Sequence, residues 1–144
     1  MRDRLKKSGF IITIILITCV MMILIYANRN MPDTRFIDTH AQLTSNEFVS
    51  LFDDNNQPQI QGLVDKAIEV RGVLKKITLK EGRYSLLLTS NLKDRYVLCK
   101  MQINQNPNVV ELAPGQNVIV KGIFKGVLLD AILLNCIIID DNDL

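Results

Sequence analysis

The sequence lacks the residue groupings on which catalysis and metal binding depend. It contains no C-x-x-C motif, no glycine-rich phosphate loop and no paired-acid signature. Its single histidine, His40, has no arrangement of serine, cysteine or carboxylate beside it that suggests catalysis. These absences argue against an enzyme, and we expect no catalytic residue, no metal site and no cofactor.

The chain beyond the N-terminal segment also has no overall excess of one sign of charge. Beyond residue 27 the sequence has 13 Lys or Arg and 14 Asp or Glu, a net charge of −1, which predicts no polyanionic partner. The distribution is uneven, because residues 66–126 hold 11 basic and four acidic residues. This local excess can attract acidic glycans, phosphorylated lipid head groups or nucleic acid. The alternative is a solvated strand surface, since the outer faces of small barrels commonly carry lysine.

One long apolar run contrasts with the rest of the chain. Residues 10–27, FIITIILITCVMMILIYA, contain no charge, and these 18 residues are about the minimum for a helix that spans a hydrocarbon core. Four basic residues precede the run, and positive charge beside a first hydrophobic segment stays in the cytoplasm. The sequence therefore predicts a cytoplasmic tail over residues 1–9, a single-pass anchor in a bacterial inner membrane over residues 10–27, and a periplasmic C-terminal part.

Two alternatives to a retained anchor remain open. A cleaved signal peptide has an apolar core of about 7 to 15 residues and ends in small residues of the A-x-A kind. This run is longer and ends in IYA at residues 25–27. Lipoprotein signals resemble Leu-x-Gly/Ala-Cys, whereas LIT precedes Cys19 here. We expect a retained helix in which Cys19 is an apolar side chain.

The residues after the apolar run are enough for one compact domain and too few for two. Residues 28–43 have weak periodicity and a proline, which predicts a linker. The domain is expected over residues 44–140, and residues 141–144 form an acidic tail.

A helix opens the predicted domain. It begins at Thr44 or Ser45, which can cap it, and runs to about Asn56. Apolar residues at three- and four-residue spacing give it one apolar face: Phe48, Leu51 and Phe52. Pro58 interrupts the helix, because proline disfavours helical structure at the residue before it. A further short turn is expected over residues 62–64.

Five strands follow, each marked by alternation or by β-branched residues. They are expected over Ala67–Leu79, Tyr84–Ser90, Arg95–Ile103, Asn117–Lys125 and Ala131–Asp140. Gly72 sits where a bulge would bend the long first strand, and Glu81-Gly82 predicts a hairpin turn. Asn106 is expected to cap a short helix between the third and fourth strands, with Pro107 at its first position.

Alternation assigns the faces of two strands. In the third strand Val97, Cys99, Met101 and Ile103 share one face. In the fourth strand Val118, Val120 and Phe124 point inward, and Lys121 and Lys125 point outward. Three meandering strands, a short helix and two closing strands describe the five-stranded Greek-key barrel called the OB-fold. The predicted fold class is mainly β with some α.

Three segments carry a family resemblance. LVDKAIEVRGVLKKI, YVLCKMQI and LAPGQNVIVKGIFKGVLLDAILLNCIIID resemble the tRNA_anti-like family of OB-fold proteins, small anchored or exported bacterial proteins. The resemblance covers roughly residues 44–139. Its specific parts are Asp65-Lys66 to Gly72 at the start of the first strand and a second series near the end: Gly122, Gly126, Asp130, Asn135 and Cys136. Phe124 departs from the family, and the family name does not establish RNA binding.

Two cysteines are expected to face the core. In an OB-fold the third and fifth strands lie side by side, and the alternation turns Cys99 and Cys136 inward. In an oxidising compartment such a pair is a disulfide candidate, worth about 2 to 4 kcal/mol. Buried free thiols behave as small apolar residues. Both states remain open, because adjacent strands do not guarantee the required Cβ separation.

The first predicted function is a ligand-binding module that uses the outer face of the barrel, where OB-folds bind oligonucleotides and oligosaccharides. Seven residues are candidates for contacting an anionic glycan or a lipid head group: Arg71, Lys75, Tyr84, Arg95, Tyr96, Lys100 and Lys121. Nucleic acid is the weaker version, because base stacking needs aromatic side chains beside the basic groups. The basic stretch offers few of them.

The second predicted function is a structural or assembly component that docks on another envelope protein. Outward apolar residues such as Leu98 and Ile123 favour it, although single exposed apolar residues are normal. Salt sensitivity separates the two functions, since charge-driven binding falls steeply as ionic strength rises.

Overall fold

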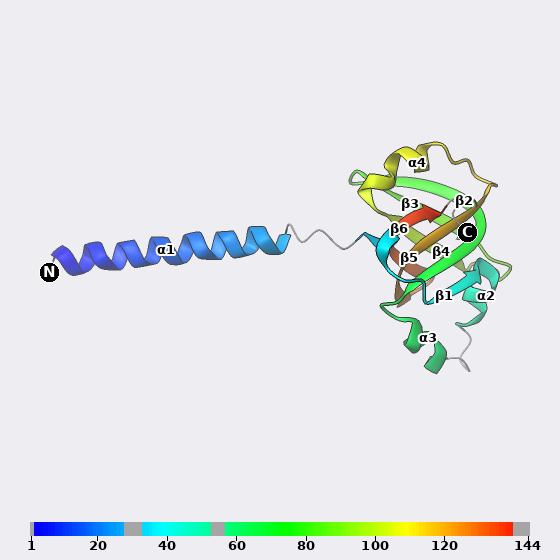
Figure 1. Ribbon diagram of the computed structural model, residues 1–144, viewed down its shortest axis with the longest axis horizontal. Coiled ribbons are helices and arrows are strands. Elements are labelled where there is room, and N and C mark those ends of the chain that lie inside the picture. The colour runs from blue at the N-terminus through cyan, green and yellow to red at the C-terminus, as the bar shows by residue number, and fades with distance from the viewer. Residues whose placement is uncertain (1, 28–32, 53–56, 140–144) are drawn as a thin grey trace. The chain divides into compact units, whose positions relative to one another are not determined.

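The chain forms two compact units, Met1–Met31 and Pro32–Leu144. The computed structural model describes residues 2–27, 33–52 and 57–139 (Figure 1). The first unit holds helix α1 (Arg2–Ala27), whose side chains are described over residues 12–25. Within the described residues, no helix is both long enough and apolar enough to cross a membrane. The predicted acidic tail, residues 141–144, lies outside the described residues.

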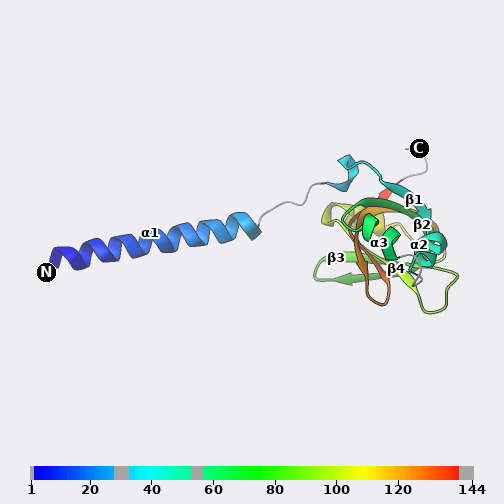
Figure 2. The same ribbon diagram turned by 90° about the horizontal axis from the view of Figure 1, so that it is seen from below.

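The second unit is a closed β-barrel. Its strands are β2 (Ala67–Lys80), β3 (Arg83–Thr89), β4 (Tyr96–Met101), β5 (Asn117–Val127) and β6 (Ala131–Ile139). They pair in the order β2-β3-β4-β6-β5, and β5 pairs back to β2 to close the sheet. Figure 2 looks toward the end that carries helices α2 and α3 and shows the strands as a ring. This topology confirms the predicted OB-fold.

The bulge in β2 does not lie at Gly72. Gly72 pairs in register with Val118, and the register shift falls between Leu74 and Lys76. Gly72 serves a different purpose, because a Cβ at this position would lie 2.8 Å from Ser45 Oγ. The missing side chain lets the start of α2 approach the strand.

Residues 33–43, assigned to the linker by the sequence, contact the barrel. They form the 3-10 helix η1 (Thr34–Phe36) and strand β1 (Ala41–Thr44), which pairs in parallel with β2. Thr34 Oγ1 donates a hydrogen bond to the carbonyl of Asn135 at 2.6 Å. The amide of His40 donates to the carbonyl of Ala67 at 2.8 Å.

The predicted first helix is shorter than expected. Helix α2 (Ser45–Ser50) has Thr44 as its N-cap, and Thr44 and Glu47 form a capping box. Helix α3 (Gln57–Leu63) then includes Gln57, contrary to the prediction that Pro58 excludes it. Proline is tolerated in the first turn of a helix, where its missing N–H has no intrahelical acceptor.

The connection between β4 and β5 differs from the prediction at its start. β4 ends at Met101, and Ile103 begins the 3-10 helix η3 (Ile103–Gln105) and is 62% exposed. Helix α4 (Asn106–Val110) follows with Gln105 as its N-cap, so Asn106 is not the cap. Asn106 instead donates a side-chain hydrogen bond to the carbonyl of Gly82 at 3.2 Å. This bond ties α4 to the β2–β3 turn.

Three phenylalanine rings pack where α2 meets the barrel. Phe48 lies 5.2 Å from Phe52 and 5.1 Å from Phe124 between ring centroids, both in edge-to-face geometry. Phe48 and Phe124 are fully buried. The inward faces predicted for two strands are confirmed for Val97, Cys99, Met101, Val118, Val120 and Phe124.

Candidate ligand-binding site

The bulge in β2 turns two neighbouring lysines to the outside of the barrel. Leu74 points inward and is buried. A bulge adds one residue and shifts the inward–outward phase of a strand. As a result Lys75 and Lys76 are both exposed, and Ile77 packs against the core.

The outer surface of the second half of β2, β3 and β4 carries a set of basic residues around an apolar row. We call this surface the basic face. Its basic members are Lys75, Lys76, Lys80, Arg83 and Lys100, all exposed. The apolar row consists of Leu87, Leu98 and Ile132, which are cross-strand neighbours on β3, β4 and β6. Lys76 of β2 pairs with Leu87 at one end of the row. Glu81 is the only acid in residues 74–89 and 96–101.

Three of these cations surround one open hollow of about 410 Å³ beside the β2–β3 turn. Its lining residues are Lys80, Glu81, Arg83, Ser85 and Lys100. Lys80 and Arg83 are direct cross-strand partners, and like charges opposite each other destabilise a sheet. Within the described parts of the chain, no acid forms a side-chain hydrogen bond or ion pair with Lys80, Arg83 or Lys100. The hollow therefore presents an excess of positive charge, with three cations against the single carboxylate of Glu81.

Tyr96 lies on the basic face, but a cation covers its ring. The ammonium of Lys75 lies 3.8 Å from the ring centroid and also donates a hydrogen bond to the Tyr96 hydroxyl. The backbone amide of Tyr96 donates to Asp130 Oδ1 at 3.0 Å, which fixes the start of β4. Tyr96 is thus held in place, and an ammonium lies over one face of its ring.

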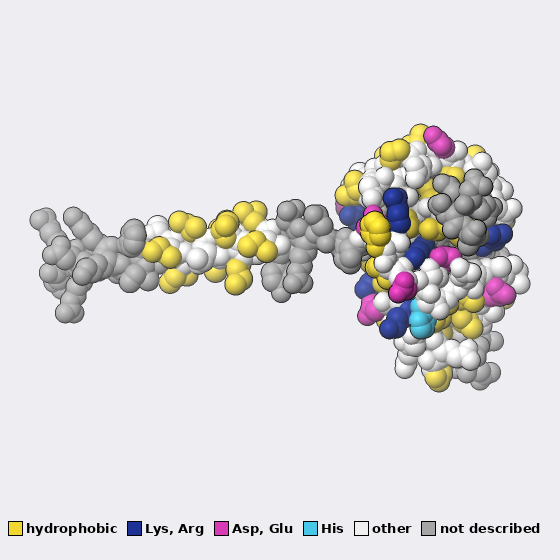
Figure 3. Space-filling model, viewed as in Figure 1, with side chains coloured by type: hydrophobic (Ala, Val, Ile, Leu, Met, Phe, Trp, Pro, Cys, Tyr) yellow, Lys and Arg dark blue, Asp and Glu magenta, His cyan; other side chains and the backbone are white. Residues whose placement is uncertain are grey.

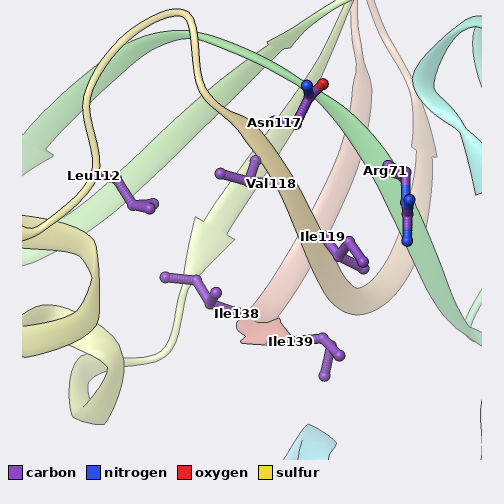
Figure 4. A pocket seen from close by; sticks show the side chains of 7 residues that line it. All are labelled: Arg71, Leu112, Asn117, Val118, Ile119, Ile138 and Ile139. Atoms are coloured by element: carbon purple, nitrogen blue, oxygen red, sulfur yellow. The ribbon is translucent and has the colours of Figure 1, made fainter. Parts of the chain in front are cut away.

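Arg71 lies in the first half of β2, away from the basic face. It is exposed and lines a hollow of about 460 Å³, shown in Figure 4. The other lining residues are Leu112, Asn117, Val118, Ile119, Ile138 and Ile139. In this view the aliphatic side chains of β5 and β6 lie between Leu112 and Arg71. Arg71 therefore belongs to a different hollow, at the start of β5.

Two further candidates also lie elsewhere. Tyr84 has the same inward parity as Leu86 and Leu88, and it packs against the core. Arg95 lies in the turn before β4, where its Nη1 is 3.5 Å from the carbonyl of Phe52. The structure thus places Lys75, Tyr96 and Lys100 on the basic face and the other four predicted residues outside it.

Lys121 is buried, contrary to the expectation that it points into solvent. Its parity in β5 is outward, yet the residue is only 7% exposed. Its cross-strand partners are Glu69 and Ile137, and η1 packs against β5 and β6. The chain that precedes the barrel covers this part of the outer face, which strand alternation alone does not reveal.

The basic face also contains three residues that were not predicted from the sequence: Lys76, Lys80 and Arg83. The sequence of β2 nevertheless indicates that Lys76 and Lys80 point outward. Unbroken alternation from Leu74 would place Lys76 and Lys80 in the core and Ile77 outside. A phase change at Lys75 removes that conflict.

Cys99 and Cys136 are both buried and are free thiols in this structure. Burial raises the pKa of the Cys136 thiol well above its usual value, and a hydrogen bond with Cys99 and the charge of Cys99 raise it further. The two side chains are therefore close enough to interact. A disulfide between them stays a prediction.

The raised pKa of Cys136 predicts a loss of stability at alkaline pH. An unfolded thiol ionises near pH 8.5, whereas the folded protein keeps Cys136 protonated to a higher pH. The stabilisation is complete below the unfolded pKa and declines as pH rises above it. Urea unfolding of the reduced protein between pH 7 and 9.5 measures this decline. Cys136→Ala should flatten the profile above about pH 8.5; an unchanged slope would contradict the assignment.

Charge elsewhere on the second unit is mixed. On the face drawn in Figure 3, Lys and Arg side chains lie among Asp and Glu side chains. Lys125, for example, pairs with Asp65 at 2.6 Å. His40 is exposed, and the described residues contain no cluster of three or more His, Cys, Asp or Glu that could hold a metal ion.

One solved structure has a similar fold over most of its length. A crystal structure of a Klebsiella pneumoniae protein, described as a "putative nucleic acid-binding lipoprotein", matches with a TM-score of 0.60 and 20% identity, over 69% of this chain and 92% of that one. The S. pombe Stn1-Ten1 complex matches with a TM-score of 0.42 and 16% identity, over 54% of this chain and 60% of that one. No curated protein sequence matches.

The sequence itself gives the family. The tRNA_anti-like family model matches residues 1–138, nearly the whole chain. This match confirms the resemblance of residues 44–139 and extends it over the N-terminal helix. The chain belongs to the tRNA_anti-like family of OB-fold binding modules.

Proposed function

We propose that the protein binds an acidic polysaccharide on its basic face. The observation that supports this proposal is the hollow around Lys80, Arg83 and Lys100, where Glu81 is the one acid beside three cations. The apolar row of Leu87, Leu98 and Ile132 crosses the same surface. Sugar rings have apolar faces that can pack on such a row while their acidic groups contact the flanking cations, and OB-folds bind oligosaccharides at this position.

Single-stranded nucleic acid is the competing ligand, and the description of the Klebsiella protein brings it into consideration. Proteins that bind single strands combine basic grooves with aromatic side chains on which bases stack. On the basic face the aromatic side chain is Tyr96, and the ammonium of Lys75 lies over one face of its ring. This arrangement favours a ligand recognised by charge and not by stacking.

Charge reversal on the basic face tests the proposal. Lys80→Glu combined with Lys100→Glu should weaken binding of the full chain to heparin, an acidic polysaccharide probe, by about 100-fold, since each tenfold loss corresponds to about 1.4 kcal/mol. The wild-type affinity should also fall steeply with salt. Titration calorimetry or fluorescence anisotropy at several salt concentrations measures both effects.

A matched control carries the same change in net charge. Lys66 and Lys93 are exposed and lie outside the basic face, so Lys66→Glu with Lys93→Glu should change the heparin affinity little. Equal losses in the two double variants would refute a specific basic face. Tighter binding of an oligothymidine than of heparin at equal salt would instead favour nucleic acid.

A protein partner is the second candidate, because the row of Leu87, Leu98 and Ile132 is apolar and only partly buried. Ile123, the other outward residue named from the sequence, lies on β5 and is also half-buried. Docking through the row would persist at high salt, whereas polysaccharide binding would not. A partner envelope protein retained at high salt on wild-type protein and lost on Leu98→Asp would support docking.

Membrane attachment through residues 10–27, with the barrel in the periplasm, is part of the same proposal. The described segment of α1 exposes apolar side chains on every side, and each large hydrophobic residue from Ile12 to Ile25 is 47–68% exposed. A helix that is apolar all round requires an apolar environment. Alkaline carbonate extraction of bacterial membranes tests this: the protein should stay in the pellet, and protease added to spheroplasts should degrade the barrel. Release into the supernatant would refute attachment.

A further inference from the structure

The turn between β5 and β6 carries two adjacent leucines that point into solvent. Leu128 is 83% exposed and Leu129 is 85% exposed. In Figure 2 the turn that joins β5 to β6 projects beyond the ring of strands. An exposed apolar pair at such a position marks an interaction surface more often than a scattered single residue does.

Hydrogen bonds hold this turn in place. The amide of Leu128 donates to the carbonyl of Asp130 at 3.2 Å, and Asp130 Oδ1 accepts the amide of Tyr96 at 3.0 Å. Gly126 adopts a φ of 123°, a conformation that L side chains rarely adopt, where the strand enters the turn. The leucines are thus presented outward by a turn that is bonded to β4.

Basic side chains stand beside the leucines. Lys93 and Arg95, in the turn before β4, line the same hollow of about 560 Å³ as Leu128 and Leu129. Among the described residues Asp94 is the single acid in that lining, and the remaining members are apolar: Phe52, Ile60 and Val127. An apolar tip beside cations matches the interface of a bilayer that contains anionic lipids, where leucines enter the acyl region and cations contact head groups.

We infer that the β5–β6 turn inserts Leu128 and Leu129 into the surface of an anionic bilayer. This inference rests on the membrane attachment proposed above. Two leucines bury less apolar area than a single acyl chain, which by itself gives only marginal membrane binding. The contact forms because α1 keeps the turn at a high effective concentration near the bilayer.

The connecting chain limits how far the barrel unit can lie from a bilayer that holds α1. Residues 28–33 join α1 to the start of η1, and six extended residues span about 20 Å. A bilayer that holds α1 therefore stays within reach of the barrel unit. The tip adds a second point of contact, which limits the orientations that the barrel can adopt.

The absence of tryptophan from the sequence permits a sharp test. Leu129→Trp places one reporter at the tip of the full chain, and Leu128→Trp provides a second. Each variant is reconstituted into vesicles of phosphatidylcholine and phosphatidylglycerol, with and without brominated acyl chains. We expect a blue-shifted emission and a loss of intensity in the brominated vesicles.

Val110→Trp is the matched control, because Val110 is 67% exposed on α4, in the connection that leads to the opposite end of β5. Its emission should be unaffected by bromine. One contrary result is that the protein floats with the vesicles while bromine quenches the tip tryptophans no more than the Val110→Trp control. That result would overturn the insertion and leave the attachment intact. A chain that does not float with the vesicles would overturn both. A blue shift without bromine quenching would indicate a protein contact and would also overturn the insertion.

Discussion

Phe48→Ala is expected to lower the free energy of unfolding of the barrel by about 3 to 5 kcal/mol. Phe48 is fully buried, and its ring contacts both Phe52 and Phe124. Removing it leaves a cavity between α2 and the barrel and takes away two edge-to-face contacts. Because Phe48 lies in the first helix after β1, the loss should also loosen α2.

Phe36→Ala is the matched control for this prediction. Phe36 lies in η1 and is 84% exposed, so the same substitution removes almost no buried area there. Urea unfolding followed by far-ultraviolet circular dichroism gives both values. A difference of less than about 1 kcal/mol between the two variants would contradict the central role of Phe48, since surface changes usually stay within about 0.5 kcal/mol.

Gly122→Ala is the second substitution with a large expected effect. A Cβ at this position would lie 2.5 Å from Cys136 Sγ, 3.1 Å from Leu133 Cβ and 3.2 Å from the carbonyl oxygen of Leu134. Overpacking of this kind costs about 1 to 3 kcal/mol, and we expect the upper end because backbone and side chain are both crowded. Thermal unfolding should show a clear drop in the melting temperature.

A second substitution identifies the cause. Cys136→Ala removes the sulfur, so Gly122→Ala should cost less in that background than in the wild type. Gly62→Ala provides the contrast, because no atom lies within 4 Å of a Cβ there and the residue is in helix α3. Alanine should stabilise that helix slightly. Equal costs of Gly122→Ala with and without the Cys136 sulfur would refute the crowding.

The strands were predictable because their signals are local. Alternation along β4 and β5 identified the buried residues, and Glu81-Gly82 predicted the hairpin whose two turn residues have positive φ values of 52° and 73°. The capping residues at Thr44 and Glu47 likewise lie within one turn of each other. Each of these features depends on neighbours in the sequence.

The candidate site was less predictable because it depends on contacts between distant parts of the chain. Lys121 looks solvent-exposed in β5, but the structure buries it on a strand against which η1 packs. Gly72 resembles a bulge residue in the sequence. Its missing side chain instead leaves room for Ser45, which lies 27 positions earlier in the chain. Lys76 was the exception, since the phase of β2 already indicated its outward position.

The pairing of β1 has a consequence for any release of the barrel from α1. β1 occupies the edge of β2 next to Ile68–Arg71, which β3 does not reach. An open edge of this kind would recruit strands from other molecules, whereas a short edge strand is a poor template. Cleavage within residues 28–32 would keep β1 in place and release a barrel that resists aggregation. Cleavage after Thr44 would remove β1, which covers this edge of β2, and also the N-cap of α2.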